Sequence, residues 1–158
     1  MMRRNLLPLF AVLATAALAQ GPKPTLTVST PPKSVVAGSR LTITVSLNIA
    51  PGFHGYQNPP AQESEIPVAV KVDGKEFKVL KVAYPPGIDA NVAGGQDATK
   101  AYEGLVKIPV TLLVPAKVGV KNLKVTVSYQ LCDESSCFPP DEVSKVVKVN
   151  VVKKAGKV

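Results

Sequence analysis

The sequence predicts an all-β domain built as an antiparallel sandwich of two sheets. Apolar and polar residues alternate with a period of two through most of the chain after residue 20. A sustained 3.6-residue apolar stripe, which marks a helix, occurs nowhere in that part of the sequence. About seven or eight short alternating runs are separated by turns rich in Gly, Pro and Asn. Strands of this number and length are typical of a sandwich of the immunoglobulin-like type.

Residues 1–19 have the three parts of a secretory signal peptide. Arg3 and Arg4 form the charged start, residues 6–18 form the apolar core, and residues 17–19 form the small-x-small motif that precedes cleavage. We therefore expect an exported protein that is periplasmic or otherwise extracytoplasmic. The alternative is that the segment is a membrane anchor that is not cleaved.

The exported part is expected to be one domain, residues 20–152, followed by a flexible tail at residues 153–158. No later segment approaches ~18 consecutive apolar residues, so we expect no membrane span in the mature chain. Loss of Arg3 and Arg4 reduces the 19 basic residues to 17, against 11 acidic residues. Most of the basic residues alternate singly with valines and few aromatics lie among them, which indicates a solvated sheet face and argues against nucleic-acid binding.

The first well-marked strand is residues 40–49, with the sequence RLTITVSLNI. Polar residues alternate in it with apolar residues that share one face, so the strand is expected to be half-buried. Further on, IPVAVKVDGKEFKVLKVAYP predicts two strands joined at Asp73 and Gly74, a dipeptide that suits a tight hairpin turn. The inward residues expected in the first strand are Leu41, Ile43, Val45, Leu47 and Ile49.

Three more strands are expected within residues 105–114, 122–131 and 143–152. Pro109 has the opposite parity to the apolar residues around it, which suggests an edge strand or a bulge. The inward residues expected in the first two of these strands are Val106, Ile108, Val110, Leu112, Val114, Leu123, Val125, Val127, Tyr129 and Leu131.

Two segments lack the alternating pattern, residues 51–65 and residues 85–99. The first concentrates aromatic, Pro and polar residues, and the second has almost no bulky side chain. Both are expected to be loops, and loops on a rigid scaffold often carry recognition. Plain surface connections are the alternative for each.

Cys132 and Cys137 are the only cysteines, and they lie in the stretch YQLCDESSCFPP. In a fully extended chain their α-carbons would be ~16 Å apart, at ~3.3 Å per residue, whereas a disulfide tolerates ~4.4 to 6.8 Å. A bond between them therefore requires the chain to reverse within residues 133–136. A hairpin achieves this, and Pro139 and Pro140 then interrupt ladder pairing.

This bond has two possible roles. Closing a loop of about six residues contributes only ~2 kcal/mol by the chain-entropy estimate, so stability is a modest reason for it. Its place beside a turn makes it reachable by an attacking thiolate, but exported domains often carry purely structural bonds. Asp133 and Glu134 disfavour a thiolate beside Cys132, so exchange would depend on a thiolate from a partner or on a base brought close by the fold.

Metal and hydrolytic sites are not expected. A structural zinc site usually has four Cys or His ligands, whereas the mature chain offers two cysteines and His54. Met1 and Met2 leave with the signal peptide, which removes thioether ligands for copper. No nucleophile elbow accompanies His54, and no motif indicates a cofactor.

YQLCDESSCFPP resembles the YQ-x-C-x(4,5)-C-x-PP signature of the N-terminal periplasmic domain of the DsbD family of thiol:disulfide interchange proteins. PGFHGYQNPP and AYEGLVKIPV precede it in the order that the family shows, and the resemblance covers essentially the whole mature chain. It implies an immunoglobulin-like sandwich whose two cysteines shuttle between dithiol and disulfide. The residues implied to form the redox pair, or to lie near it, are Cys132, Cys137, Phe53, His54, Tyr56, Tyr129 and Phe138.

The resemblance also implies partners. We expect a monomeric electron carrier without a cofactor, which serves thioredoxin-like extracytoplasmic proteins, disulfide isomerisation or cytochrome c maturation. Because the sequence ends at Val158, its donor is expected to be a separate membrane electron transporter. Cys137 is the sulfur favoured to form the mixed disulfide, and whether the domain acts as a protein-disulfide reductase with turnover of its own is left open.

One segment departs from the family pattern. Residues 91–99 match its aromatic cap but contain neither Phe nor Tyr, so a cap built on Gly94 and Gly95 is expected to be mobile or absent. The alternative function is an immunoglobulin-like binding or assembly module. In that case the bond is inert and residues 51–65 form the contact surface.

Overall fold

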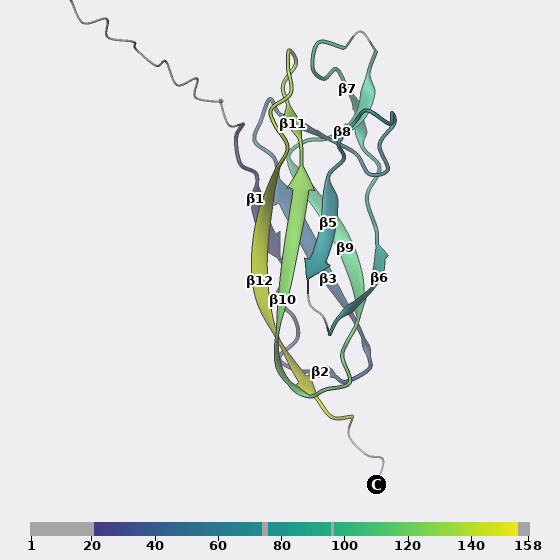
Figure 1. The fold of residues 1–158 in the computed structure, drawn as a ribbon, viewed down its shortest axis with the longest axis vertical. Coiled ribbons are helices and arrows are strands. Elements are labelled where there is room, and N and C mark those ends of the chain that lie inside the picture. Colours follow the sequence, from purple (N-terminus) through teal and green to yellow (C-terminus); the bar gives the residue numbers. More distant parts are fainter. Residues whose placement is uncertain (1–20, 74–75, 96, 155–158) are drawn as a thin grey trace, which may run out of the picture.

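A computed structural model describes residues 21–73, 76–95 and 97–154, and the expected signal peptide lies outside this part of the chain. The described residues form an all-β structure, as predicted, with the strands stacked into an elongated body (Figure 1). Among these residues no helix is long and apolar enough to cross a membrane. The strands are β1 (Thr25–Val28), β2 (Val35–Val36), β3 (Arg40–Asn48), β4 (His54–Tyr56), β5 (Ala69–Asp73), β6 (Lys78–Val82), β7 (Ile88–Ala90), β8 (Thr99–Tyr102), β9 (Leu105–Leu113), β10 (Gly119–Tyr129), β11 (Leu131–Cys132) and β12 (Asp141–Val152).

Two four-stranded sheets form the sandwich. The first has the order β1-β3-β9-β6, and the second has the order β2-β12-β10-β5. All pairs within them are antiparallel except β12 with β2. Every inward residue predicted for the strands at residues 40–49, 105–114 and 122–131 is buried, and these residues belong to one continuous core.

A third, smaller sheet was not predicted. Its order is β11-β4-β8-β7, and β7, β8 and β11 lie together at one end of the sandwich (Figure 1). The segments at residues 51–65 and 85–99 were expected to be loops, but they contribute β4, β7 and the first residue of β8. Strands of three or four residues are too short for an alternating pattern to reveal them.

Two further expectations for the sandwich were wrong. β5 and β6 do not form a hairpin with each other, because β5 pairs with β10 in one sheet and β6 pairs with β9 in the other. Pro109 lies in β9, which is flanked on both sides by β3 and β6, and so it is not on an edge. The register irregularity is in β6, between Val79 and Lys81, and the Pro109 carbonyl still accepts a hydrogen bond from the Ala83 amide at 2.9 Å.

Candidate redox site

The two cysteines close a hairpin turn at the end of the molecule that carries the third sheet. Cys132 ends β11 and pairs with Cys137 as an antiparallel bridge, with their α-carbons 3.9 Å apart and their sulfurs bonded. The Asp133 amide donates to the Ser136 carbonyl, and the Phe138 amide donates to the Leu131 carbonyl, each at 2.9 Å. The four-residue turn predicted from the cysteine spacing is therefore present. β12 begins directly after Pro140.

Asp133 organises the turn with its side chain. One carboxylate oxygen accepts the Ser135 amide and the Ser135 hydroxyl at 2.8 Å and the Ser136 amide at 2.7 Å. These donors, with the Ser135 hydroxyl contributing most, hold the pKa of Asp133 below its usual value. The carboxylate therefore fixes a turn geometry in which the two cysteines face each other.

The two cysteines differ sharply in exposure. Cys132 is 0% exposed, whereas Cys137 is exposed. Cys132 packs in a small apolar cluster with Val92 and Ala101, apart from the main core. An approaching thiolate can therefore reach the sulfur of Cys137 more easily than the sulfur of Cys132.

A loop from the β7–β8 hairpin lies against the cysteine turn, so the cap is present, although residues 91–99 contain neither Phe nor Tyr. The Ala93 amide donates to the Asp133 carbonyl at 2.9 Å, and the Gly94 amide donates to the Glu134 carbonyl at 2.7 Å. Ala93 and Gly94 both have positive φ angles, 56° and 70°, which turn consecutive amides toward the cysteine loop. The cap uses backbone donors and the small side chain of Val92 in place of an aromatic ring.

Tyr56 is the residue of the predicted aromatic segment that reaches the disulfide. Its hydroxyl lies 3.7 Å from Cys137 Sγ, within hydrogen-bond range for sulfur. Burial, and secondarily the negative charge of Glu65, raise the pKa of Tyr56. The hydroxyl therefore stays protonated and is available as a donor to sulfur.

His54 lies next to the cysteine turn in the third sheet, Phe138 follows the turn in the sequence, and Phe53 precedes His54. The His54 backbone pairs with Cys132 across β4 and β11, and His54 Nε2 lies 3.4 Å from a carboxylate oxygen of Glu103. The rings of Phe53 and Phe138 are 5.9 Å apart, centroid to centroid. These residues support the cysteine turn through its backbone and through packing.

Tyr129 is placed differently from the other predicted residues. Its side chain belongs to the main core and is 3% exposed. Among the described residues its hydroxyl has no hydrogen-bond partner. Burial, together with the negative charge of Asp141, raises its pKa to about 12. Its place in the core indicates a packing role.

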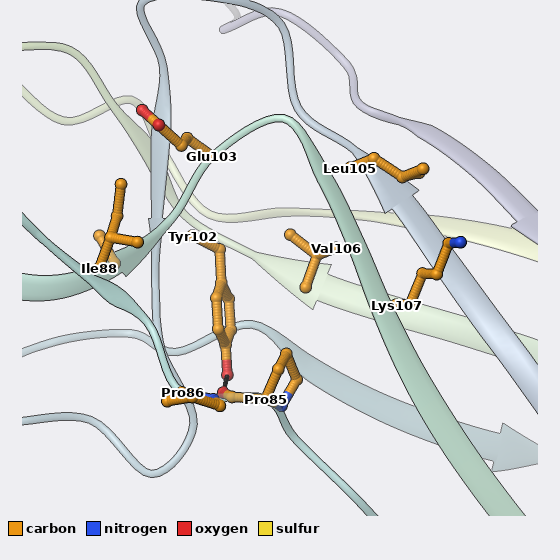
Figure 2. Close-up of a pocket in the computed structure, with 9 residues that line it drawn as sticks. Pro85, Pro86, Ile88, Tyr102, Glu103, Leu105, Val106 and Lys107 are labelled. Atoms are coloured by element: carbon orange, nitrogen blue, oxygen red, sulfur yellow. Dashed lines mark hydrogen bonds between the residues drawn. The ribbon is translucent and has the colours of Figure 1, made fainter.

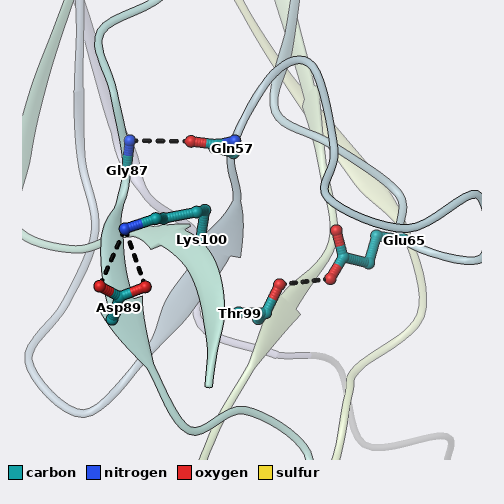
Figure 3. Close-up of polar contacts among 6 residues, drawn as sticks. All are labelled: Gln57, Glu65, Gly87, Asp89, Thr99 and Lys100. Carbon is teal, nitrogen blue, oxygen red and sulfur yellow. Dashed lines mark hydrogen bonds and ion pairs between the residues drawn. The ribbon is translucent and has the colours of Figure 1, made fainter. Parts of the chain in front are cut away.

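Sequence reasoning missed Glu65, which is almost fully buried at the edge of this site. Its carboxylate accepts the backbone amides of Ala61 and Gln62 at 2.8 and 3.1 Å and the Thr99 hydroxyl (Figure 3). Figure 3 also shows two contacts at the β7–β8 hairpin. The Gly87 amide donates to the Gln57 side chain, and Lys100 binds Asp89. A single Glu in a polar segment gives no signal of such a role in the sequence.

A shallow pocket lies beside the site, between the segment at residues 85–88 and the start of β9. Its volume is about 310 Å³, and Figure 2 shows the Tyr102 side chain within its wall. The Tyr102 hydroxyl donates to the Pro85 carbonyl at 2.8 Å, and the pocket is otherwise lined mainly by apolar side chains. We assign no chemistry to it.

Comparisons with known proteins agree with this geometry. Residues 25–148 match the family described as "Thiol:disulfide interchange protein DsbD, N-terminal". The fold is similar to the crystal structure of the DsbD N-terminal domain of Neisseria meningitidis in the reduced form. The TM-score is 0.51 and the identity 18%, over 80% of this chain and 84% of that one. No protein with a curated description matches the chain significantly.

Proposed function

Because this chain belongs to the family of the DsbD N-terminal domain, we propose that it exchanges disulfides for dithiols through Cys132 and Cys137. The observation that carries the proposal is the asymmetry of the bond: Cys137 is exposed and Cys132 is 0% exposed. Exchange needs one sulfur open to attack and one that leaves. A bond at the end of the sandwich, outside the main core, also opens without dismantling that core.

The exchange proceeds in two balanced steps. A partner thiolate attacks Cys137 Sγ and forms a mixed disulfide, while the bond to Cys132 Sγ breaks and that sulfur leaves as a thiolate, which takes up a proton. The second thiol of the partner, as its thiolate, then attacks the partner's own sulfur in the mixed disulfide and releases Cys137. The partner ends as a disulfide and this chain as a dithiol. The same steps in reverse reduce a downstream disulfide.

The partners belong to this proposal. Thioredoxin-like extracytoplasmic proteins bring paired cysteines of the required kind, and a separate membrane electron transporter supplies the electrons. Disulfide isomerisation and cytochrome c maturation are the processes that such a carrier serves. We expect residues 1–19 to act as a signal peptide that directs the mature domain, residues 20–152, out of the cytoplasm, and we expect this domain to act as a monomer.

The alternative is a binding or assembly module with an inert bond. Two features favour it: the complete burial of Cys132, and the two backbone hydrogen bonds from Ala93 and Gly94 that cover the turn. An inert bond would leave residues 51–65 as the contact surface.

Mixed-disulfide trapping tests the proposal. The variants C132A and C137A each leave one free cysteine. They are presented to a thioredoxin-like protein that lacks its resolving cysteine and whose remaining cysteine carries 5-thio-2-nitrobenzoate as a mixed disulfide, so that this group leaves when the free cysteine attacks. We expect C132A to form a mixed disulfide through Cys137 readily, and C137A to form little because Cys132 is buried. If both variants remain folded and neither is trapped, the bond is structural.

A further inference from the structure

The carboxylates of this protein gather at the end that carries the cysteine turn. Nine of the 11 acidic residues belong to the segments at this end, which are the turn, the cap hairpin, the connections on either side of the third sheet and the start of β12. Among the described residues, the basic residues at this end are Lys23 and Lys100, which are paired with Asp141 and Asp89, and Lys107, which lines the pocket that Glu103 also lines. We call these nine residues the acidic end: Glu63, Glu65, Asp89, Asp97, Glu103, Asp133, Glu134, Asp141 and Glu142.

The rest of the sandwich has the opposite charge. The two remaining acidic residues, Asp73 and Glu76, each lie against a lysine, at 3.4 Å from Lys71 and 2.8 Å from Lys121. The basic residues along this part of the described chain are Lys33, Arg40, Lys71, Lys78, Lys81, Lys117, Lys121, Lys124, Lys145, Lys148, Lys153 and Lys154. A net positive protein therefore presents its exposed disulfide in a locally negative field.

This field acts on the attacking group. A thiolate that approaches Cys137 brings a negative charge close to Asp133 and Glu134, which flank the bond in the same turn. Like charges in proximity raise the free energy of the encounter, and opposite charges steer partners to a surface and raise association rates by ~10 to 10³-fold. The attack is thus disfavoured unless the partner carries positive charge around its own sulfur.

We propose that the acidic end is the docking surface for a redox partner whose reactive cysteine is surrounded by lysine or arginine side chains. The inference rests on the proposed function, because Cys137, the exposed cysteine of the pair, is what brings the partner to this end. Basic side chains on the partner neutralise the carboxylates and stabilise its thiolate at the moment of attack. A partner with an acidic rim is rejected by the same field, so charge selects among thiol proteins of similar reactivity.

Small thiols of different charge test this on the mature protein without a partner. The disulfide is reduced by cysteamine, 2-mercaptoethanol and 3-mercaptopropionate, whose thiolate forms carry no net charge, one negative charge and two negative charges. Each rate is corrected for the thiolate fraction and divided by the rate with oxidised dithiothreitol, an uncharged disulfide. At ~10 mM ionic strength, where the Debye length is ~30 Å, we expect cysteamine to be favoured over 3-mercaptopropionate by about tenfold.

Matched variants locate the effect. E134Q with E142Q removes two exposed carboxylates at the acidic end, and K145Q with K148Q removes two exposed lysines from the body of the sandwich. We expect the first pair to reduce the preference for cysteamine severalfold, the second pair to leave it nearly unchanged, and ~1 M salt to abolish it.

Two results overturn the inference: equal corrected rates for the three thiols at low salt, or equal effects of the two pairs of variants. Neither affects the proposed function, since reduction by 2-mercaptoethanol still shows an exchangeable bond. If the bond resists all three thiols in the folded protein, both the proposed function and this inference are wrong.

Discussion

The Tyr56 hydroxyl lies 3.7 Å from the Sγ atom of Cys137, although the two residues are 81 positions apart in the sequence. The third sheet brings them together. β4 pairs with β11, where Cys132 lies opposite His54, and Cys132 in turn pairs with Cys137 and is bonded to it. The contact joins the sulfur of the exposed cysteine to a hydroxyl whose pKa is raised by burial.

Replacing Tyr56 with Phe is expected to slow the chemistry of Cys137 without unfolding the protein. A protonated hydroxyl stabilises the Cys137 thiolate, and a hydrogen bond of this kind contributes ~0.5 to 1.5 kcal/mol, or roughly three- to tenfold. In the reduced protein, alkylation of Cys137 should slow by that factor, and its pH profile should move to higher pH. Mass spectrometry of iodoacetamide-treated protein measures both.

Tyr84 supplies the matched control. Its hydroxyl accepts the Val70 amide at 2.8 Å, so Y84F also removes a tyrosine hydroxyl hydrogen bond, but one made within the sandwich. Y84F should leave the alkylation profile of Cys137 unchanged. A similar slowing in Y84F and Y56F would contradict the assignment of Tyr56 to the sulfur.

Gly94→Ala is expected to loosen the cap over the cysteine turn. An added Cβ has room, with its nearest neighbour the Ser135 carbonyl at 3.5 Å, but the φ angle of 70° costs a non-glycine residue ~1 to 2 kcal/mol. The closed arrangement becomes less populated, so reduction by 2-mercaptoethanol should accelerate severalfold. Stopped-flow kinetics with quenched alkylation give the rate.

Gly38→Ala separates this effect from a general loss of stability. Gly38 also has a positive φ, 73°, and an added Cβ there meets nothing within 4 Å. It lies in the turn between β2 and β3, outside the third sheet. The same acceleration in G38A would show that the cap does not control access.

Asp133 is expected to influence the equilibrium constant between the disulfide and the dithiol. We expect this effect to come from the turn that its side chain holds and not from its charge. D133N keeps a side-chain oxygen for the Ser135 and Ser136 amides, whereas D133A removes all three contacts. The disulfide of D133A should be reduced more readily, by a few-fold in the equilibrium constant, and that of D133N should stay close to the wild type. An equal change in both variants would assign the effect to charge.

The lowered pKa of Asp133 also predicts a direction with pH. A carboxyl whose pKa is lower in the folded state contributes stability above its unfolded pKa and loses it as pH falls through the folded value. The turn should therefore weaken only below pH ~4, where the unfolded-state carboxyl begins to take up protons. Amide hydrogen exchange of Ser135 and Ser136 between pH 2 and 5, corrected for intrinsic rates, tests this, with D133N as the variant that lacks the effect.

Tyr129 predicts a loss of stability in alkali. Its pKa is about 12 in the fold and ~10 in the unfolded chain, so between these values the unfolded state binds fewer protons and the free energy of unfolding falls as pH rises. At 1.36 kcal/mol per pH unit the loss is on the order of 2 kcal/mol. Y129F should show a shallower decline in urea unfolding from pH 10 to 12. An unchanged slope would contradict the shift.

The sequence was sufficient to predict the strands that bury one face over many residues. β3, β9 and β10 each have nine residues or more, and their alternation is set by the core they share. The partners of β5 and β6 could not be predicted, because the Asp73–Gly74 pattern fits a local hairpin equally well. β5 pairs with β10 and β6 pairs with β9, both far away in the sequence, and these pairings place the two strands in different sheets.

At the site, local geometry was predictable and long-range contacts were not. The spacing of Cys132 and Cys137 required a reversal in the residues between them, which the structure contains. The cap contact is made by backbone amides, and a sequence pattern carries no information about where amides point. Because residues 91–99 contain neither Phe nor Tyr, the cap was expected to be mobile or absent. In the structure, the amides of Ala93 and Gly94 donate hydrogen bonds to the turn.

The equilibrium between the Cys132–Cys137 disulfide and the dithiol is the most direct test of the proposed exchange. The mature protein is equilibrated in thiol and disulfide buffers of defined potential, and the alkylated cysteines are counted by mass while circular dichroism reports the fold. We predict a two-electron titration at a potential above about -300 mV with the fold intact, as expected of an exchangeable bond. A bond that stays closed below that potential, in a protein that remains folded, would contradict the proposal.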